Sequence, residues 1–436
     1  MRIDVLSLNE RTARVSQGSL RKNIASLYVV QFATYLIPLA TLPWLTRTLG
    51  VEGFGRLAFC TAVNAYFVIL VDYGFNLSAT RKIALNRNDR ASCSATFWTT
   101  MAAKGALAII GLLVLLSLTF LVERLAQDRP LLLLGYVAVV GNVLTPSWYF
   151  QGTEQLSRLS FITVSLRLLA IPLTFLCVTA HSDLPIAMAI SACSPLAVGL
   201  VCCVFLLRGR AVSIVLPTGA TVLAAMCEGW SLFLSTASTT LYTAANPIIL
   251  GFVAGNIAVG HYNAAERLLS AVRGLIGPIS QSLYPRITRL MNDSQADAFA
   301  LVRKLLRLQG AATLALSAFL FAGAPSLVAV LYGSAFEDTL HVLRWLSLLP
   351  FVIGISNVLG IQTMLPLGMN HAFSRILVGA GLLHVLALLY FTHLSGAVGA
   401  AMAVLLTETS VAIAMACTLW HRRVPIFVRT VAWGTR

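Results

Sequence analysis

The chain has 436 residues, of which 58% are hydrophobic and only 11% are charged, and its mean hydropathy is +0.83. A soluble protein of this length could not bury so much apolar surface, so the composition excludes a soluble enzyme and indicates a polytopic membrane protein. In a soluble chain the net charge of +15 would suggest nucleic-acid binding. In a membrane protein the first test is whether the basic residues gather on one side of the membrane. The cysteines and histidines show no metal-ligand spacing, so we predict no metal site and no cofactor.

Apolar stretches long enough to cross a bilayer, about 20 residues each, recur along the whole chain. They predict an all-α polytopic membrane protein with about twelve transmembrane helices joined by short connections. The expected spans are residues 24–46, 55–77, 97–122, 130–150, 161–180, 185–207, 229–252, 258–285, 308–332, 342–366, 373–392 and 396–420.

The basic residues sort by side when the N-terminus is placed in the cytoplasm. Of the 31 lysines and arginines, 22 then fall on the cytoplasmic side, five on the opposite side and four inside spans. This split follows the positive-inside rule, so it supports the span count and predicts that both termini are cytoplasmic. Topology thus accounts for the net charge, and we expect membrane lipids and no nucleic acid as partners.

Short motifs recur about half a chain apart. The run at residues 50–59 resembles the run at residues 255–264. Three further matches have a similar offset, namely Asn142 with Asn357, Gly152 with Gly368 and Arg158 with Arg375. The repeat predicts two parallel six-helix bundles, residues 1–210 and residues 211–436, the second with a short basic cytoplasmic tail. Parallel halves of this kind are typical of transporters, in which the substrate site lies between the halves.

The first span of each predicted half carries a polar stripe. The two stripes are Gln31, Thr34, Tyr35, Pro38 and Thr41 in the first half, and Ser235, Ser238, Thr239, Tyr242 and Asn246 in the second. Such stripes either line a cavity or reflect ordinary packing of small polar residues between membrane helices. From them we take Gln31 and Tyr242 as candidate substrate-binding residues.

The stretch 255–289 is long enough to span a bilayer, yet it carries charges in its middle. On a helix, one stripe collects Asn263, Glu266, Ser270, Arg273, Gly277, Ser280 and Tyr284. A charge at bilayer depth costs at least about 2.5 kcal/mol, so this stripe should face water or a partner. We therefore predict a wet, cationic cavity in which Asn263, Arg267 and Arg273 bind substrate. The alternative is that Glu266 pairs with Arg273 or Arg267 and simply holds helices together.

Four other ionisable residues fall inside predicted spans. Arg167 lies one third of the way into its span, so we expect it to be a third substrate-binding arginine. Asp72, Glu266 and Glu408 are candidates for ion coupling or for charge partners, because a buried carboxylate can either exchange a proton or pair with a cation. Lys104 is close enough to the cytoplasmic end of its span to snorkel.

Enzyme motifs are missing from the sequence. The chain has no DxD pair, no P-loop, no GxSxG and no HExxH. The short predicted connections also leave no periplasmic loop large enough to hold the active site of a polymerase or a lipid-linked transferase. We therefore predict that the protein is not an enzyme.

Three stretches carry a resemblance to a known family. Residues 45–87 contain the run Asp72-Tyr-Gly-Phe-Asn-Leu-Ser-Ala-Thr-Arg81, residues 146–152 read Pro-Ser-Trp-Tyr-Phe-Gln-Gly, and residues 263–267 read Asn-Ala-Ala-Glu-Arg. With Pro278 and the Tyr284-Pro285-Arg286 run, they resemble the Wzx-type O-antigen and exopolysaccharide flippases. These flippases form the polysaccharide-transporter branch of the multidrug/oligosaccharidyl-lipid/polysaccharide superfamily. The similarity covers roughly residues 20–420.

The resemblance implies a MATE-like fold of twelve helices in two bundles that flank a cationic cavity. It implies that the protein carries undecaprenyl-diphosphate-linked oligosaccharide repeat units from the cytoplasmic to the periplasmic leaflet of the bacterial inner membrane, by ion-coupled alternating access. It would place Arg267 and Arg273 near the diphosphate and glycan, and Asp72 and Glu266 as charge partners or coupling carboxylates. Related flippases of O-antigen and lipopolysaccharide pathways act beside a polymerase and a chain-length regulator, which are therefore candidate partners.

Two other functions remain as alternatives. A small-molecule or drug antiporter of the same fold would need an acidic cavity suited to cations, against which the arginines argue. A membrane glycan polymerase would need a periplasmic catalytic loop, for which the predicted topology leaves no room.

Overall fold

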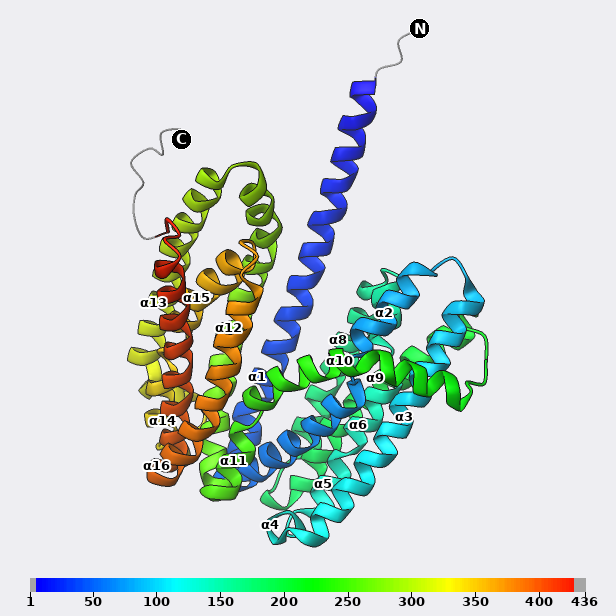
Figure 1. Ribbon diagram of the computed structural model, residues 1–436. Helices are drawn as coiled ribbons and strands as arrows, with labels where there is room; N and C mark the ends of the chain where they lie inside the picture. The colour runs from blue at the N-terminus through cyan, green and yellow to red at the C-terminus, as the bar shows by residue number, and fades with distance from the viewer. Residues whose placement is uncertain (1–4, 427–436) are drawn as a thin grey trace.

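The computed structural model describes the backbone of residues 5–426, and all side chains in that range except those of residues 5–38, 231–232, 235–243 and 275–282. Figure 1 shows that the described chain is helical, and it contains no strand, which confirms the all-α fold class. The helices of the first part are α1 (Val5–Asp72), α2 (Phe75–Leu85), α3 (Arg90–Leu121), α4 (Glu123–Ala126), α5 (Arg129–Gly135), α6 (Val137–Leu144), α7 (Ser147–Gly152), α8 (Leu156–Cys177), the short η1 (His181–Asp183) and α9 (Leu184–Arg208). Those of the second part are α10 (Gly219–Thr243), α11 (Asn246–Val253), α12 (Gly255–Asp293), α13 (Gln295–Leu331), η2 (Ser334–Phe336), α14 (Thr339–Leu346), α15 (Leu349–Leu359), η3 (Gly360–Met364) and α16 (Asn370–His421).

Two long helices bend where the sequence predicts a boundary between spans. Gly50 has a φ of 67° inside α1, where the first two predicted spans meet. Ser395 and Gly396 leave helical geometry inside α16, between the last two predicted spans. A left-handed φ is inexpensive only for glycine, which explains a sharp bend at these points.

Side-chain caps mark two helix starts at connections that are predicted to be cytoplasmic. The Asp89 side chain accepts hydrogen bonds from the backbone N–H groups of Ala91 and Ser92 at the start of α3. The Ser294 hydroxyl accepts from the Asp297 N–H at the start of α13. These caps satisfy donors that the first helical turn leaves without partners.

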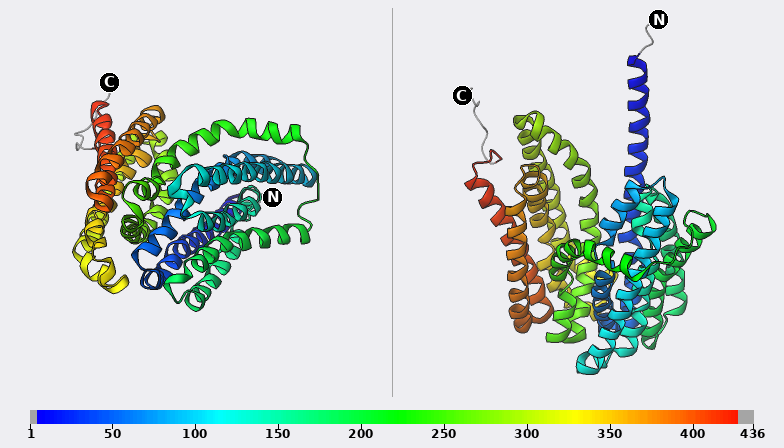
Figure 2. Two further views of the ribbon diagram at one scale, coloured as in Figure 1. Left: turned by 90° about the horizontal axis from the view of Figure 1, so that it is seen from below. Right: turned by 45° about the vertical axis from the view of Figure 1, so that its right-hand side comes forward.

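The helices gather in two groups. Figure 1 places α3, α5, α6, α8 and α9 on one side and α13 to α16 on the other, and the turned views of Figure 2 keep the same grouping. Between them, α1 and α12 form the most extensive helix pair in the structure. The crossing helix α10 contacts α1, α2, α3 and α16, so it also reaches from one group to the other.

One large hydrophobic core joins the two groups. It contains buried residues of α1, α3, α6 and α9 together with residues of α11, α12, α14 and α16. Two smaller cores lie within single groups, one around Phe97 and Trp148 and the other around Met415 and Leu419. The two groups therefore share buried side chains in the middle of the molecule.

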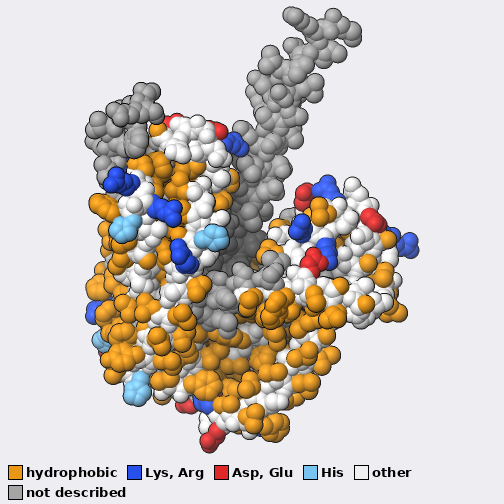
Figure 3. Space-filling view, viewed as in Figure 1, with side chains coloured by type: hydrophobic (Ala, Val, Ile, Leu, Met, Phe, Trp, Pro, Cys, Tyr) orange, Lys and Arg blue, Asp and Glu red, His pale blue; other side chains and the backbone are white. Residues whose placement is uncertain are grey.

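The outer surface is apolar in the manner of a membrane protein. Figure 3 shows hydrophobic side chains over most of the described surface in that view, while lysines and arginines gather in its upper half. Eight helical segments of the described residues are long and apolar enough to cross a membrane. Two of them, Leu39–Leu85 and Asn370–His421, each contain one of the bends above. The count of twelve spans stays a prediction, since α10 and α12 contain residues outside the described side chains.

Candidate substrate cavity

A polar cavity of about 270 Å³ lies between α1 on one side and α11, α12 and α16 on the other. Five of the candidate site residues from the sequence line it: Asn263, Glu266, Arg267 and Arg273 on α12, and Glu408 on α16. The remaining wall consists of Ala58, Thr61, Ala62, Ala65, Ala244, Asn246, Pro247, Tyr262, His384, Val404 and Thr407. Small residues on α1 leave the space that the charged side chains of α12 enter.

The charged side chains of α12 that line the cavity have partners on the same helix. Glu266 Oε2 lies 3.4 Å from Arg273 Nη2, and Glu266 Oε1 accepts a hydrogen bond of 3.2 Å from the Ser270 hydroxyl. Arg267 Nε donates to Asn263 Oδ1 at 3.4 Å. About a third of the Arg273 side chain and a quarter of the Glu266 side chain remain exposed, so this ion pair is open to the cavity. The pairing of Glu266 with Arg273 and the lining of a cavity therefore occur together. The two readings of the sequence do not exclude each other.

A buried chain of hydrogen bonds forms another wall of the cavity. Asn246 Nδ2 donates to the Tyr262 hydroxyl at 2.8 Å, and Asn246 Oδ1 lies 2.8 Å from His384 Nε2. Since an amide oxygen can only accept, His384 must carry a proton on Nε2. Its Nδ1 lies 3.1 Å from the Thr407 hydroxyl, which also lies 2.8 Å from the Ala403 carbonyl. The chain ties α11, α12 and both limbs of α16 together beside the charged residues.

Histidine 384 and Thr407 were not among the residues predicted for the site. His384 stands alone in the apolar run of residues 373–392, and it has no motif or ligand spacing around it. The only signal in the sequence was a polar side chain inside a predicted span, the same signal that identified Glu408.

Asp72 and Lys104 form a second polar centre outside this cavity. The Lys104 side chain is 1% exposed, and its Nζ lies 3.1 Å from Asp72 Oδ1 and 3.0 Å from both the backbone and side-chain oxygens of Asn142. These oxygens satisfy the three donors of the ammonium group. Lys104 therefore does not snorkel, and it serves as the charge partner of Asp72.

Three other predicted site residues are not seen to line this cavity. Arg167 is part of α8, which packs against α1 and α9, and it is not among the residues that line the cavity. The side chains of Gln31 and Tyr242 lie outside the described residues. Their assignment to the substrate site stays a prediction.

Near the cavity, α1 and α12 cross with their backbones in contact. A Cβ atom at Gly55 would stand 1.9 Å from the carbonyl oxygen of Asn256, and one at Gly260 would stand 2.3 Å from that of Val51. Only glycine permits so close an approach. The two glycines occupy matching positions in the sequence repeat, and the structure places the two copies against each other. We call this contact the glycine crossing.

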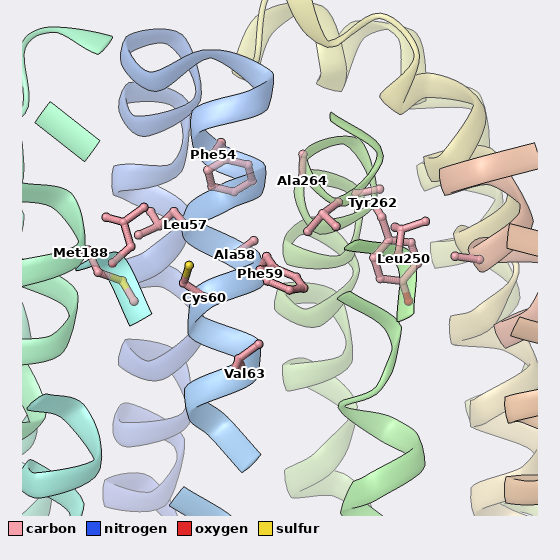
Figure 4. Packing of buried hydrophobic residues seen from close by; sticks show 14 of the residues in the cluster. Phe54, Leu57, Ala58, Phe59, Cys60, Val63, Met188, Leu250, Tyr262 and Ala264 are labelled. Carbon is pink, nitrogen blue, oxygen red and sulfur yellow. The ribbon is translucent and has the colours of Figure 1, made fainter. Parts of the chain in front are cut away.

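Aromatic and aliphatic side chains surround the glycine crossing. Figure 4 shows the second limb of α1 between Met188 on one side and Leu250 and Tyr262 on the other. Phe59 points from α1 toward α11, where a Cβ on Gly251 would stand 2.3 Å from its ring. The side chains of α1 and α11 are therefore in close contact at this point.

A cluster of charges lies beside the glycine crossing. Asp128, whose side chain is 1% exposed, pairs with Arg56 at 2.6 Å and with Arg124 at 2.9 Å. Arg124 also donates to the Gly251 carbonyl at 3.3 Å and to the Asn256 side chain. This Asp128 cluster joins the first part of the chain to α11 and α12, beside connections that are predicted to be periplasmic.

Comparison with known sequences identifies the family. A family model described as polysaccharide biosynthesis protein matches residues 20–291. A protein of Escherichia coli (strain K12) named "Putative O-antigen transporter" is 37% identical over 390 residues, which cover 89% of this chain and 94% of the relative. A protein of Shigella dysenteriae with the same name is 28% identical over 396 residues, 91% of this chain and 99% of the relative.

Solved structures share the fold at low sequence identity. One described as lipid II flippase MurJ in an inward closed conformation has a TM-score of 0.65 and 12% identity, covering 91% of this chain and 87% of its own. A multidrug resistance MATE family transporter in an inward-facing conformation has a TM-score of 0.63 and 14% identity, covering 93% and 100%. These similarities confirm the MATE-like fold class. Since the family model matches more than half of the chain and a relative 37% identical spans most of it, the chain belongs to the polysaccharide biosynthesis protein family, as its motifs predicted.

Proposed function

We propose that the protein is a flippase that carries undecaprenyl-diphosphate-linked oligosaccharide repeat units from the cytoplasmic to the periplasmic leaflet of the bacterial inner membrane. Both termini would lie in the cytoplasm, and the halves 1–210 and 211–436 would move against each other. The observation that carries the proposal is a polar cavity with Arg267, Arg273 and Asn263 on its wall, in a chain whose relatives are named O-antigen transporters. The relatives are named as transporters, which agrees with the prediction that the chain is not an enzyme.

The two arginines suit an anionic head group. A guanidinium presents several donors in a plane, so Arg267 and Arg273 can each hold two phosphate oxygens at once. Asn263 adds donors and acceptors for sugar hydroxyls. Arg167 remains a candidate for a later step on the path, since it does not line this cavity.

The Glu266–Arg273 pair offers a way to couple an ion to the substrate. Glu266 Oε2 lies 3.4 Å from Arg273 Nη2, so a diphosphate that binds Arg273 must compete with this carboxylate. A proton or cation that neutralises Glu266 would free Arg273, and by linkage the bound diphosphate would favour that ion to the same extent. Glu408, on the same cavity, is the second coupling candidate.

Alternating access would require the closed end to open. The glycine crossing and the Asp128 cluster join the two groups of helices near the predicted periplasmic end, so these contacts would have to separate before the head group leaves on that side. The same contacts would re-form when the empty carrier returns.

A drug or small-molecule antiporter of the same fold is the second candidate. Glu266 and Glu408 place two carboxylates beside the two arginines, so the cavity can also accommodate a cation. The flippase would work beside the polymerase and chain-length regulator of its pathway, whereas an exporter would need neither partner.

The test uses cells that lack their own flippase and make a matching repeat unit. The wild-type chain should restore surface polysaccharide, and Arg273→Ala should accumulate lipid-linked repeat units at normal expression. Restoration by Arg273→Ala equal to wild type would contradict a role for the arginine in transport. Efflux of cationic dyes without any restored polysaccharide would favour the antiporter.

A further inference from the structure

A second pocket follows the polar cavity along one face of α16. It has a volume of about 220 Å³ and lies between α15, η3 and the two limbs of α16. Thr407 and Glu408 line both spaces, while Val404 lines only the cavity and Val411 and Met415 line only the pocket. Spacings of three and four residues place these side chains on one face of a helix, so the two spaces are neighbours along that face. We call the second space the Glu408 pocket.

The Glu408 side chain lies where the two spaces meet. Its carboxylate accepts no hydrogen bond from the described residues, although the side chain is partly buried. Polar groups inside proteins normally have hydrogen-bonding partners. Both carboxylate oxygens are therefore available to a ligand that occupies the pocket.

The lining of the Glu408 pocket suits a neutral ring that carries hydroxyl groups. Ser356, Asn357 and Glu408 offer hydrogen-bonding groups, and Phe373 and Met415 offer apolar surface. Among the described residues no lysine or arginine lines the pocket, so a phosphate there would face the Glu408 carboxylate without a counter-charge. An acyl chain would leave the same carboxylate buried without a hydrogen bond, which is unfavourable. Pockets for drug-sized ligands have about 300–1,000 Å³, so this smaller one suits a single sugar ring.

The sequence repeat shows how the two halves differ at this place. In the first half, the side-chain oxygen of Asn142 lies 3.0 Å from Lys104 Nζ. Its counterpart in the second half, Asn357, lines the Glu408 pocket. A lysine of the protein thus lies beside the asparagine in one half, and a pocket lies beside it in the other.

We infer that the Glu408 pocket binds the sugar that is attached to the diphosphate, while Arg267 and Arg273 hold the diphosphate in the adjoining cavity. This inference rests on the proposed function and adds to it a site for one sugar. Val404 and Met415 are 11 positions apart, about 16 Å along the helix, which is long enough for a diphosphate followed by one ring. The stripe runs toward the predicted cytoplasmic end, so the sugars would trail on the side from which the repeat unit enters.

Hydrogen bonds to Glu408 would make the pocket selective for the first sugar. A site that is built to bind a hydroxyl group discriminates strongly against ligands that lack it, because its own polar groups then stay without partners. The arginines would bind any lipid diphosphate, whereas the Glu408 pocket would distinguish a sugar-bearing one.

Binding measurements on the purified full-length protein test this inference. The probes are undecaprenyl diphosphate alone and undecaprenyl diphosphate that carries one glucose, galactose or N-acetylglucosamine. At least one sugar-bearing probe should bind about tenfold more tightly than the probe without sugar, and Glu408→Gln should lower this ratio of affinities about tenfold, the effect of one charged hydrogen bond. The ratio cancels any change that the substitution makes to binding of the diphosphate itself. Glu337→Gln removes an exposed carboxylate that lines neither space, so it should keep the wild-type ratio. A wild-type ratio of one for every sugar, or an unchanged ratio in Glu408→Gln, would overturn the inference.

Cysteine protection locates the sugar and separates this inference from the proposed function. In a background without the natural cysteines, Thr61→Cys reports on the cavity and Asn357→Cys on the pocket. Undecaprenyl diphosphate should slow thiol labelling only at position 61, and the sugar-bearing probe that binds most tightly should slow it at both positions. Equal protection of position 61 by both probes with none at position 357 would refute the sugar site and leave the proposed function standing. If no probe binds or protects position 61, the proposed function fails, and this inference fails with it.

Discussion

The glycine crossing makes a prediction about the balance between closed and open states. In Gly55→Ala, the new Cβ would stand 1.9 Å from the Asn256 oxygen, and α1 and α12 must move apart by about 1 Å before that distance reaches the 3.0 Å below which real Cβ atoms are almost never found. Overpacking of this kind costs about 1–3 kcal/mol. The cost falls only on the conformation in which the crossing is closed, so the ratio of closed to open molecules should fall by about 5–150-fold.

A cysteine in the cavity reports that ratio. Ala62→Cys, on the cavity wall and in a background without the eight natural cysteines, would be treated with a membrane-impermeant maleimide from the periplasmic side. Gly55→Ala should raise the labelling rate. The matched control is Gly105→Ala, because a Cβ at Gly105 meets nothing within 4 Å.

The control also corrects for backbone effects. Replacing a helical glycine with alanine stabilises the helix by about 0.5–1 kcal/mol in the closed and the open state alike. This gain should appear in both Gly55→Ala and Gly105→Ala, and by itself it should not change the labelling of Ala62→Cys. Unchanged labelling of Ala62→Cys in a folded Gly55→Ala protein would refute the view that the crossing is a gate.

Two further predictions concern buried polar groups. Asp72→Asn leaves the buried Lys104 ammonium without its charge partner, so the unfolding temperature should fall strongly. Breaking a buried ion pair costs about 3–5 kcal/mol, and this is an upper figure here because the Asp72 side chain is 30% exposed. Lys82→Met removes an exposed pair and should change the unfolding temperature little; equal losses would contradict the argument. His384→Ala removes the partner of the buried Asn246 amide oxygen, so the free energy of unfolding should fall by about 1–3 kcal/mol. His393→Ala, at an exposed position, should leave the free energy of unfolding unchanged. A neutral His384→Ala would mean that water replaces the imidazole.

Helical periodicity predicted that one face of α12 meets a cavity, and three residues of that face do so. Asn263, Glu266 and Arg273 share one stripe in the sequence, and all three line the cavity. Arg267 follows Glu266 directly and lies off that stripe. It lines the cavity all the same, because a long arginine side chain can reach around the helix.

Pairing between distant helices could not be read from periodicity. The sequence identified Asp72 and Lys104 separately as ionisable residues inside spans, 32 positions apart, and their contact depends on how α1 packs against α3. The same holds for His384, whose partners Asn246 and Thr407 come from other segments. The repeat likewise predicted two similar halves and gave no sign that Gly55 and Gly260 would meet.

The bends account for part of the difference between the twelve predicted spans and the eight candidate segments of the described residues. Hydropathy marks the ends of apolar runs, but α1 and α16 continue as helices through Gly50 and Gly396, so two predicted spans merge into one long element in each case. The family motif at residues 146–152 coincides with α7, whose Trp148 and Phe150 are fully buried. Its role in the fold is therefore packing.

The measurement that tests the central claim most directly is translocation of undecaprenyl-diphosphate-linked repeat units by purified protein in vesicles. The wild type should move the lipid-linked units across the bilayer. Arg273→Lys should keep part of the wild-type translocation rate, because lysine retains the charge but lacks the planar guanidinium. Arg273→Ala should lower the translocation rate at least about tenfold, which is the effect of losing one charged hydrogen bond. Arg344→Ala, at a position on α14 that does not line the cavity, should translocate at the wild-type rate. Equal rates for Arg273→Ala and Arg344→Ala would contradict the account.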